Sequence, residues 1–341
     1  MITRVWYRFV LRLRDHQMMM APRSDADIAE LRDRCTRFLH GHGPVKAADM
    51  LATIPPDTAV DRYGDGGVVA TLEEEIAILL GKPAAVFLPS GTMAQQAVLR
   101  VHADHRGRRT IVFHPMCHLE QREEQGYRRL QQLTGRAAGD RNSLITMADL
   151  TAIAEPVAAL LLELPQRDIG GQQPPWDELA GQCDWARGAR AAVHLDGARL
   201  WESAAGYGRP PADVGALFDT VYVSFYKGIG ALPGCCVAGP PDIINEVREW
   251  RERMGGMLFG LWPNAASARS YLAVRLPRMA GYLEHARAIA AALGAIPGVQ
   301  VVPDPPQTSM MHMLITTTAE RFAATARALA TEHASGPGRA R

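Results

Sequence analysis

The sequence predicts an α/β fold in which helices cover a mainly parallel β-sheet. From about residue 71 onward, apolar segments of strand length alternate with segments of helical period. The strand segments are apolar at nearly every position, as in 157–164, which indicates burial on both faces and is typical of a parallel sheet between helices. After Pro240 the pattern is mostly helical with two short strands, which predicts a small α+β unit at the C-terminal end.

The individual elements follow from this alternation and from the Gly, Pro and polar residues that bound each apolar run. In the first part we expect helix 72–80, strand 84–88, helix 92–105, strands 110–113 and 157–164, helix 176–187, and strands 191–195 and 220–224. In the last part we expect helices 243–253, 265–276 and 279–293, strands 299–302 and 310–315, and helix 319–332. The domain organisation we expect is an N-terminal arm with helices over 1–60, a large domain over 61–254 and a small, abbreviated domain over 255–341.

The composition indicates an ordinary globular protein whose partner is a small molecule. The 341 residues are 47% hydrophobic, and 37 Lys and Arg residues nearly balance 36 Asp and Glu residues, so no net field favours nucleic acid or an anionic membrane. The apolar segment 5–13 is interrupted by Arg8 and Arg12 and is too short to span a bilayer; it is an amphipathic arm or sequence upstream of a start near Met18. The five cysteines have no zinc or redox spacing and are interpreted as reduced thiols of a cytoplasmic protein without a metal site: Cys35, Cys117, Cys183, Cys235 and Cys236.

Two charged residues stand where buried strands are expected to end. Asp196 ends one apolar strand, and Lys227 follows the next strand, just before Gly228. A lysine amine can form a Schiff base with the aldehyde of pyridoxal phosphate, and a carboxylate can keep its ring nitrogen protonated. Burial favours the neutral, nucleophilic form of a lysine, and a glycine lets the backbone pass close to a ligand. An Asp at a strand end is also a common turn former or helix cap, so the pair carries this prediction.

Further polar residues are expected at the same sheet edge. Arg199, three residues after Asp196, can grip a substrate carboxylate, and the alternative is an ion pair with Asp196 or Glu202. Ser90, Gly91 and Thr92 open a helix, where backbone N–H groups favour a phosphate. Taken alone, an ordinary Ser N-cap explains them better, and their place among the other motifs is what favours the phosphate site. Ser224, three residues before Lys227, can add a hydrogen bond to the phosphate.

Two histidines and a glutamate complete the candidate residues. His118 follows a strand and precedes a helix, so it can stack on a cofactor ring or act as an acid or base. His114 lies nearer the strand and can be a structural hydrogen-bond donor instead. Glu163 closes the strand 157–164 and must find hydrogen-bond donors there, either for catalysis or for the following loop.

Five motifs occur in order along about residues 60–315. They are Tyr63-Gly64-Asp65-Gly66 before Leu72-Glu73, Ser90-Gly91-Thr92-Met93-Ala94, Cys117-His118, His194-Leu195-Asp196-Gly197-Ala198-Arg199-Leu200 and Lys227-Gly228-Ile229-Gly230-Ala231. Together they resemble the threonine aldolase and β-eliminating lyase family of fold-type-I pyridoxal-phosphate enzymes. The fourth and fifth motifs, at this separation, are the most specific part of the resemblance.

The resemblance implies a fold-type-I architecture, with a mainly parallel seven-stranded sheet, helices on both faces and a small C-terminal α+β domain. It implies a homodimer or homotetramer that cleaves the Cα–Cβ bond of a β-hydroxy-α-amino acid into glycine and an aldehyde. The roles it implies are Lys227 as the residue that holds pyridoxal 5'-phosphate, Asp196 on the ring nitrogen, His118 stacked on the ring, Ser90, Gly91 and Thr92 on the phosphate, and Arg199 near the ring on the substrate carboxylate.

The chain departs from the family pattern at three places. The family's R-S-D-T segment ahead of the Tyr63 motif has no clear match, and roughly that part of the chain reads Leu39-His40-Gly41-His42-Gly43-Pro44. Where the family reads E-N-T-H-N, this chain reads Glu163-Leu164-Pro165-Gln166-Arg167, so Gln166 replaces a histidine associated with aldol cleavage. Because a glutamine cannot act as a base near neutral pH, we expect Gln166 to bind the substrate. After residue 315 we find no match for the family's second carboxylate-binding arginine.

These departures keep two alternatives open. One is a β-eliminating or β-substituting enzyme that acts on an amino acid, which would give pyruvate and ammonia in place of glycine and an aldehyde. The other is a catalytically degenerate subunit with a structural or regulatory role. The presence of Lys227, Asp196, Arg199 and His118 together argues against the second alternative, because no packing requirement asks for all four at strand ends.

Overall fold

The computed structural model describes residues 45–318 without interruption. Near the N-terminus it also describes 5–6, 10–12, 18–20 and 37–38, and near the C-terminus 320–322, 324–325 and 327–328. The expected arm over 5–13 and the expected helix 319–332 lie only partly within these residues, and Cys35 lies outside them.

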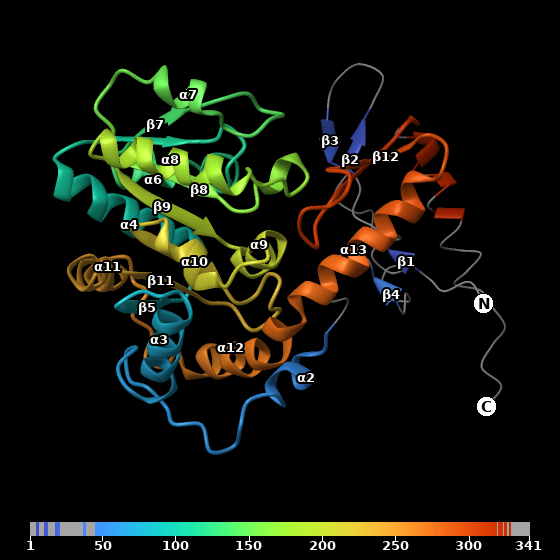
Figure 1. The fold of residues 1–341 in the computed structure, drawn as a ribbon. Coiled ribbons are helices and arrows are strands. Elements are labelled where there is room, and N and C mark those ends of the chain that lie inside the picture. Colours follow the sequence, from blue (N-terminus) through green and yellow to red (C-terminus); the bar gives the residue numbers. More distant parts are fainter. Residues whose placement is uncertain are drawn as a thin grey trace, which may run out of the picture.

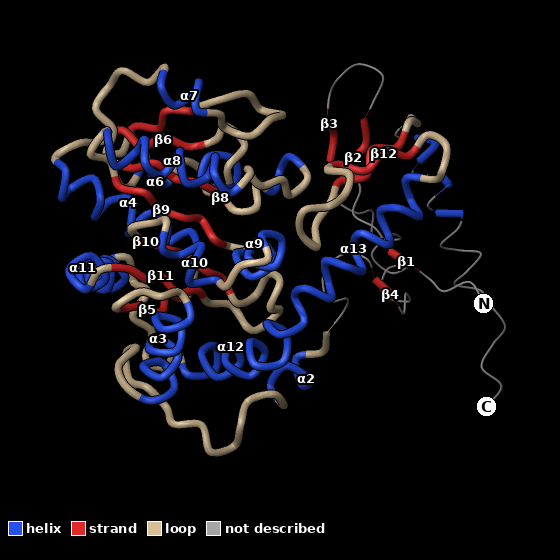
Figure 2. The backbone as a smooth tube through the Cα atoms, in the orientation of Figure 1, coloured by secondary structure: helices blue, strands red, loops and turns tan. Residues whose placement is uncertain are grey.

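The centre of the molecule is a seven-stranded sheet (Figures 1 and 2). In spatial order its strands are β5 (Ala84–Leu88), β11 (Cys235–Gly239), β10 (Thr220–Ser224), β9 (Ala192–Gly197), β8 (Ala159–Glu163), β6 (Thr110–Phe113) and β7 (Thr134–Ala137). Strands β10, β9, β8, β6 and β7 pair in parallel, whereas β11 runs antiparallel to both β10 and β5. The expectation of a mainly parallel seven-stranded sheet is confirmed.

Helices cover both faces of this sheet. Alternate residues of β8 enter different cores: Leu160 and Leu162 belong to one, Ala159 and Leu161 to the other. This double burial explains why the strand is apolar at every position before Glu163. The main helices of the first core are α3 (Gly67–Leu79), α8 (Trp176–Gly188), α9 (Leu200–Tyr207), α10 (Pro211–Ala216) and α12 (Trp262–Arg275). The helices of the second core are α4 (Gly91–Arg106), α5 (His118–Arg122), α6 (Gly126–Arg129) and α11 (Pro241–Arg253).

The last described elements form the expected α+β arrangement beside the sheet (Figure 1). Helix α13 (Met279–Gly294) packs against α9 and leads to an antiparallel pair, β12 (Val299–Val302) and β13 (His312–Ile315). Strand β2 (Val10–Arg12) lies beside β13 and pairs with β3 (Met18–Met20). Further described elements are β1 (Val5–Trp6), β4 (Arg37–Phe38), α2 (Ala47–Leu51), α7 (Met147–Thr151) and the short 3-10 helices η1 (Arg167–Ile169) and η2 (Leu276–Arg278).

Two strands of the sheet carry no signal that sequence reasoning recognised. Strand β7 reads Thr-Gly-Arg-Ala and is mostly exposed at the sheet edge, so it has no apolar run. Strand β11 is buried throughout, but it is short and built of small residues after a Gly- and Pro-containing turn. Its antiparallel direction follows from the tight return of the chain after β10, which leaves no room for a crossover helix.

A buried ion cluster fastens α3 to the sheet. Glu73 on α3 accepts a hydrogen bond from the Phe87 N–H of β5 at 2.7 Å and contacts the Arg248 guanidinium at 3.1 and 3.3 Å. Arg251, 1% exposed, lies 4.0 Å from Glu73 and donates to the Phe87 carbonyl at 2.9 Å. Burial raises the pKa of Glu73, and the two arginines oppose that rise.

The described residues were compared with the sequence-based expectations about a membrane span, a metal site and the state of the cysteines. Within the described ranges, none of the helices combines the length and the apolar character that crossing a bilayer would need. No group of three or more His, Cys, Asp or Glu side chains in this part of the chain is arranged to hold a metal ion. The four described cysteines are buried and free.

Candidate active site

The carboxyl ends of three neighbouring strands bring the candidate residues together. Glu163 of β8 pairs in register with Asp196 of β9, and Asp196 pairs with Tyr222 of β10. Lys227 follows β10 by three residues. Parallel strands present their carboxyl ends at one edge of a sheet, and that edge is where open α/β sheets bind ligands.

Lys227 carries a partly buried amine surrounded by charges of both signs. Burial lowers its pKa, the carboxylates of Asp196 and Glu163 raise it, and the guanidinium groups of Arg199 and Arg167 lower it. A lowered pKa makes the neutral amine easier to reach near neutral pH. Four charged residues therefore lie close enough to act on the Lys227 amine: Asp196, Glu163, Arg199 and Arg167.

Asp196 is 2% exposed and is held by the backbone that follows it. Its Oδ1 accepts a hydrogen bond from the Ala198 N–H at 3.1 Å, and its carbonyl accepts one from the Leu164 N–H at 3.0 Å. The strand continues to Gly197, two residues beyond the expected end, so Asp196 is fixed inside β9 rather than in the loop. A carboxylate held this way is a well-positioned acceptor for a protonated ring nitrogen.

The N-terminus of α4 lies beside this row of residues. Ser90 is the N-cap, and its Oγ accepts a hydrogen bond from the Met93 N–H at 3.2 Å. The N–H groups of Gly91 and Thr92 lie in the first turn, where the helix supplies no acceptor, so both the capping and the anion-binding interpretation of Ser90 are compatible with the geometry. A Cβ at Gly91 would lie 2.2 Å from the Tyr222 hydroxyl, so the helix start and β10 touch here.

The Ser224 hydroxyl has a partner within the protein. It donates to the Ala198 carbonyl at 2.9 Å, and the residue is fully buried at the end of β10. The contact ties the loop after Asp196 to the strand that precedes Lys227. The predicted hydrogen bond from Ser224 to a phosphate stays a prediction.

His118 is oriented by two carboxylates. Its backbone N–H donates to Glu163 Oε2 at 2.8 Å, and its Nδ1 lies 3.0 Å from Glu123 Oε1. The His118 side chain is 30% exposed, whereas that of Glu123 is 1% exposed, and Glu123 Oε2 has no hydrogen-bond partner. Burial raises the pKa of Glu123, and the contact with His118 opposes this rise. With Glu123 ionised, its carboxylate accepts the proton of Nδ1 and leaves Nε2 as an acceptor.

Glu163 connects the His118 segment to the loop that contains Gln166. Its second oxygen, Oε1, accepts a hydrogen bond from the Arg167 N–H at 3.1 Å. Burial and then the negative charge of Asp196 raise its pKa to about 7, against the effect of the two N–H donors. Glu163 therefore both supports the loop and remains in electrostatic contact with Lys227 and Asp196.

Arg199 begins α9 and is partly exposed at the site. Its charge lowers the pKa of Lys227 and favours the ionised form of Glu202, so it lies near both residues. Among the described residues it forms no ion pair with Asp196 or Glu202, so the alternative ion pair is not observed. The guanidinium thus remains a candidate for a substrate carboxylate.

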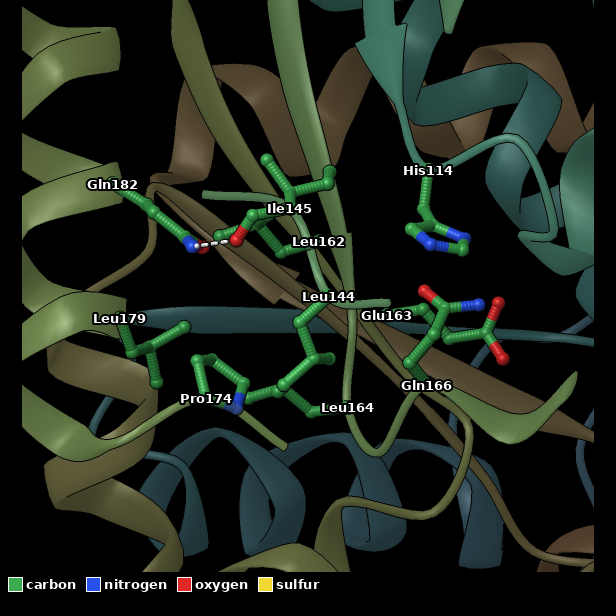
Figure 3. Close-up of a pocket in the computed structure, with 10 residues that line it drawn as sticks. All are labelled: His114, Leu144, Ile145, Leu162, Glu163, Leu164, Gln166, Pro174, Leu179 and Gln182. Carbon is green, nitrogen blue, oxygen red and sulfur yellow. Dashed lines mark hydrogen bonds between the residues drawn. The ribbon is translucent and has the colours of Figure 1, made fainter. Parts of the chain in front are cut away.

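Gln166 and His114 lie at a small cavity next to the site (Figure 3). Its volume of about 20 Å³ suits one water molecule. Figure 3 shows His114, Gln166 and Glu163 on one side of this cavity, and Leu179, Pro174 and Leu164 on the other.

The two polar side chains of the cavity differ in how they are bonded. The Gln166 side chain is buried and its Nε2 has no partner, so its predicted contact with a substrate stays a prediction. His114 accepts a hydrogen bond from the Met116 N–H at Nδ1 (3.0 Å), which leaves Nε2 to donate to the Ser143 carbonyl (2.8 Å). His114 is therefore a structural donor.

Three residues of the site were missed by sequence reasoning. Tyr222 was interpreted only as part of an apolar strand, Glu123 was not singled out, and Glu202 was considered only as a partner of Arg199. The spacing of Glu202 three residues after Arg199, one helical turn, was the only available signal. Glu123 and Tyr222 acquire their importance from segments far away in the sequence.

A family model described as Beta-eliminating lyase matches residues 46–317. An aldolase of Penicillium aethiopicum is 32% identical over 251 residues, which is 70% of this chain and 63% of that protein, so the chain spans less than two thirds of it. Low-specificity L-threonine aldolase 1 of Arabidopsis thaliana is 27% identical over 265 residues, 74% of this chain and 73% of that protein.

Two solved structures resemble this one closely. A proposed L-allo-threonine aldolase from Listeria monocytogenes EGD-E has a TM-score of 0.87 at 38% identity, over 92% of this chain and 88% of that one. A proposed aromatic amino acid β-eliminating lyase/threonine aldolase from Exiguobacterium sp. 255-15 has a TM-score of 0.87 at 36% identity, over 90% and 88%. The fold is therefore that of the fold-type-I enzymes, and because the family model covers most of the sequence, the chain belongs to the threonine aldolase / β-eliminating lyase family.

Proposed function

We propose that this chain is a pyridoxal-phosphate-dependent lyase that cleaves the Cα–Cβ bond of β-hydroxy-α-amino acids, in the manner of a threonine aldolase. The observation that carries the proposal is the placement of Lys227 and Asp196. A partly buried amine and a buried carboxylate act on each other at the carboxyl edge of the sheet, beside the N-terminus of α4. The threonine aldolases among the relatives support the same reaction.

The chemistry of the donor set fits the cofactor. Lys227 offers an amine for an aldehyde, Asp196 a carboxylate for a protonated ring nitrogen, and the first turn of α4 two N–H groups for a phosphate. The first turn of α4 lies beside strand β9 because Tyr222 of β10, the register partner of Asp196, touches Gly91. When bound, pyridoxal phosphate supplies an aldehyde for the amino group and a conjugated ring that accepts the electron pair of the broken bond.

The protein's own groups then have separate tasks. Lys227, with its lowered pKa, binds the cofactor as a neutral amine. Asp196, held by the Ala198 N–H, keeps a proton on the ring nitrogen through its carboxylate. Arg199 binds the carboxylate of the amino acid, and this contact fixes which bond at Cα stands ready to break.

His118 is the residue we propose for the proton of the β-hydroxyl group. Glu123 holds its Nδ1, so the partly exposed ring presents Nε2 as the acceptor. Glu163 fixes the backbone at the same residue. Stacking of this imidazole on the cofactor ring and acceptance of a proton at Nε2 are compatible, because stacking uses the ring face and proton transfer uses its edge.

Product analysis tests the proposed reaction. The protein with pyridoxal phosphate is incubated with L-threonine, L-allo-threonine and phenylserine, and glycine and the matching aldehyde are measured. We expect both products in equal amounts with at least one substrate, and a large loss of rate in His118→Ala. Cofactor binding without any glycine from these substrates would refute aldol cleavage.

A specific feature favours β-elimination as the second candidate. Gln166 stands in place of a histidine and its amide is buried, so the site has one imidazole fewer than the family pattern. An eliminating enzyme would release pyruvate and ammonia from serine or cysteine. The same incubations, extended to these two amino acids, separate the two reactions by their products.

We infer that the enzyme is a cytoplasmic homodimer or homotetramer. Leu258 and Phe259 are exposed, and the Phe259 ring packs edge-on against exposed Tyr63 at 5.4 Å between ring centroids. Exposed apolar side chains that gather in this way favour a protein interface. Light scattering on the purified protein measures its mass directly, and Phe259→Asp is expected to shift that mass toward a single subunit.

A further inference from the structure

A network of buried polar side chains lies between α4 and the sheet, and the proposed reaction does not use it. His194 and Thr220 lie in the neighbouring strands β9 and β10, pair in register and are fully buried. Gln95 and His102 reach this pair from α4, and each is 1% exposed. Because buried polar groups need hydrogen-bond partners, the bonds among these four side chains define how the helix sits on the sheet.

Three hydrogen bonds connect the four side chains. His194 Nε2 lies 2.8 Å from Gln95 Oε1. His194 Nδ1 and His102 Nε2 each lie 2.8 Å from Thr220 Oγ1. Within the described part of the chain, Gln95 Nε2 has no hydrogen-bond partner. Helix α4 is thus bonded to the sheet twice, through Gln95 and, about two turns later, through His102.

The donors and acceptors of these bonds follow from the groups involved. An amide oxygen only accepts, so the Gln95 carbonyl accepts the proton of His194 Nε2. Burial lowers the pKa of His194 to about 3, against the effect of the Thr220 backbone, so the ring is neutral and its Nδ1 accepts the hydroxyl proton of Thr220. His102 Nε2 then donates to the Thr220 oxygen, and His102 Nδ1 faces the Arg106 guanidinium, a donor, at 3.5 Å. The bonds therefore all run in one direction, from α4 into the sheet and back to α4.

This network lies directly behind the residues of the proposed site. Successive side chains of a strand point to opposite faces, so His194 and Asp196 lie on the same face of β9, the face that Gln95 reaches from α4. Tyr222, the register partner of Asp196, touches Gly91 in the first turn of α4. Gly91 precedes Gln95 by about one helical turn. The bond between His194 and Gln95 therefore fastens α4 next to its phosphate-binding turn.

The cofactor has a planar ring with a short phosphate arm, so its two binding points must be correctly spaced. In the proposed site, the first turn of α4 binds the phosphate and Asp196 of β9 binds the ring nitrogen. A shift of α4 relative to β9 would weaken one of these contacts. Hydrogen bonds weaken steeply when distance and angle depart from their preferred values, and a buried polar network rigidifies the elements that it joins. The bond between helix and strand thus fixes a separation that apolar packing alone leaves adjustable.

We propose that His194, Gln95 and Thr220 are positioning residues for the cofactor. They set the separation between the phosphate-binding turn of α4 and Asp196, so that the phosphate and the ring nitrogen are bound at the same time. They act through α4 and β9 rather than by contact with the cofactor. This inference rests on the proposed function, because it takes the phosphate to lie at α4 and the ring nitrogen at Asp196.

A comparison of pyridoxal phosphate with pyridoxal isolates the contribution of the phosphate. Pyridoxal keeps the aldehyde and the ring nitrogen but has a hydroxyl group in place of the phosphate. Both Kd values are measured by titration of the cofactor-free protein, followed by the visible absorption of the bound compound. The readout is the ratio of the Kd for pyridoxal to the Kd for pyridoxal phosphate. A general loss of stability acts on both compounds alike and leaves this ratio unchanged.

Gln95→Met is the main variant, and a neighbouring glutamine supplies its control. The substitution removes the acceptor of the His194 proton, and the amide nitrogen that it also removes has no partner. We expect the Kd for pyridoxal phosphate to rise about tenfold and the Kd for pyridoxal to stay unchanged. Gln96 is the next residue of α4 and is also buried, but its amide faces Gly126 of α6, so Gln96→Met should keep the ratio of the unmodified protein. Thr220→Val, which keeps the shape and removes the hydroxyl, should lower the ratio as Gln95→Met does.

The outcomes separate this inference from the proposed function. Equal Kd values for the two compounds in the unmodified protein would refute the phosphate site at α4, and the inference would fall with it. An unchanged ratio in Gln95→Met would leave the phosphate site standing and refute the spacing role. An equal rise of both Kd values in Gln95→Met would indicate a general structural role and would refute the inference as well. If Gln95→Met does not fold, Thr220→Val decides by the same criteria.

Discussion

Removal of the charge of Glu73 should destabilise the protein strongly. In Glu73→Gln the amide oxygen can keep the hydrogen bond from the Phe87 N–H, but the two contacts with Arg248 at 3.1 and 3.3 Å are lost as charged interactions. Arg251, 1% exposed, would lose its Glu73 charge partner and keep the Phe87 carbonyl and the electrostatic effect of Asp65 and Asp61. Breaking one partner of a buried ion pair costs about 3–5 kcal/mol, because the remaining charge stays buried.

The chain contains its own control for this prediction. Glu75, two residues further along α3, contacts Arg269 at 2.6 and 2.8 Å, but both side chains are largely exposed. Glu75→Gln should therefore cost only about 0–1 kcal/mol, and 1 M salt should remove that difference but not the effect at Glu73. Urea unfolding followed by fluorescence and circular dichroism measures both variants. Equal losses in the two variants would refute the argument from burial.

Two further predictions concern the site. Gly91→Ala should displace the Tyr222 hydroxyl, which would lie 2.2 Å from the new Cβ, and should weaken cofactor binding about tenfold or more. The control is Gly188→Ala, which has open space around it and should leave cofactor binding unchanged. Equal Kd values for the cofactor in the two variants would contradict this prediction. The second prediction concerns Glu163, whose pKa in the folded protein is raised from 4.5 to about 7, so that its ionisation opposes folding. Its contribution to the free energy of unfolding is most favourable below pH 4.5. That contribution is lost as the pH rises to 7, and the loss is about 3 kcal/mol. Urea unfolding of the cofactor-free protein between pH 4.5 and 8 should show this decline, and a Glu163→Gln variant with the same decline would exclude Glu163 as its source.

A strand of the sheet, or a residue of the site, was predictable where its own stretch of sequence shows a strand or helix pattern. Lys227, Asp196 and Ser90 each follow or end a recognisable apolar run, so the rule that parallel strands share a carboxyl edge was enough to group them. Strand β7 was not predicted because its exposed position at the sheet edge needs no apolar residues, and its sequence resembles that of a loop.

The contacts that refine the site were not predictable from local patterns. Glu123 matters because it is buried under His118, and Glu202 matters because Gly228, from another strand connection, leaves room for its carboxylate. Both depend on how segments distant in the sequence pack, which periodicity and spacing do not report. Packing also decides where the Gln166 amide lies, at a small cavity that Glu163 lines as well, and its contact with a substrate stays a prediction.

Identification of the lysine that binds the cofactor tests the central proposal most directly. The chain has three lysines, Lys46, Lys82 and Lys227, so borohydride reduction of the protein with pyridoxal phosphate, followed by peptide mass spectrometry, has a small set of possible answers. The proposed site predicts the cofactor mass on the peptide that contains Lys227, and loss of both this label and the visible absorption band in Lys227→Ala. Cofactor attached to Lys46 or Lys82, or no attachment at all, would contradict the proposed site and the reaction derived from it.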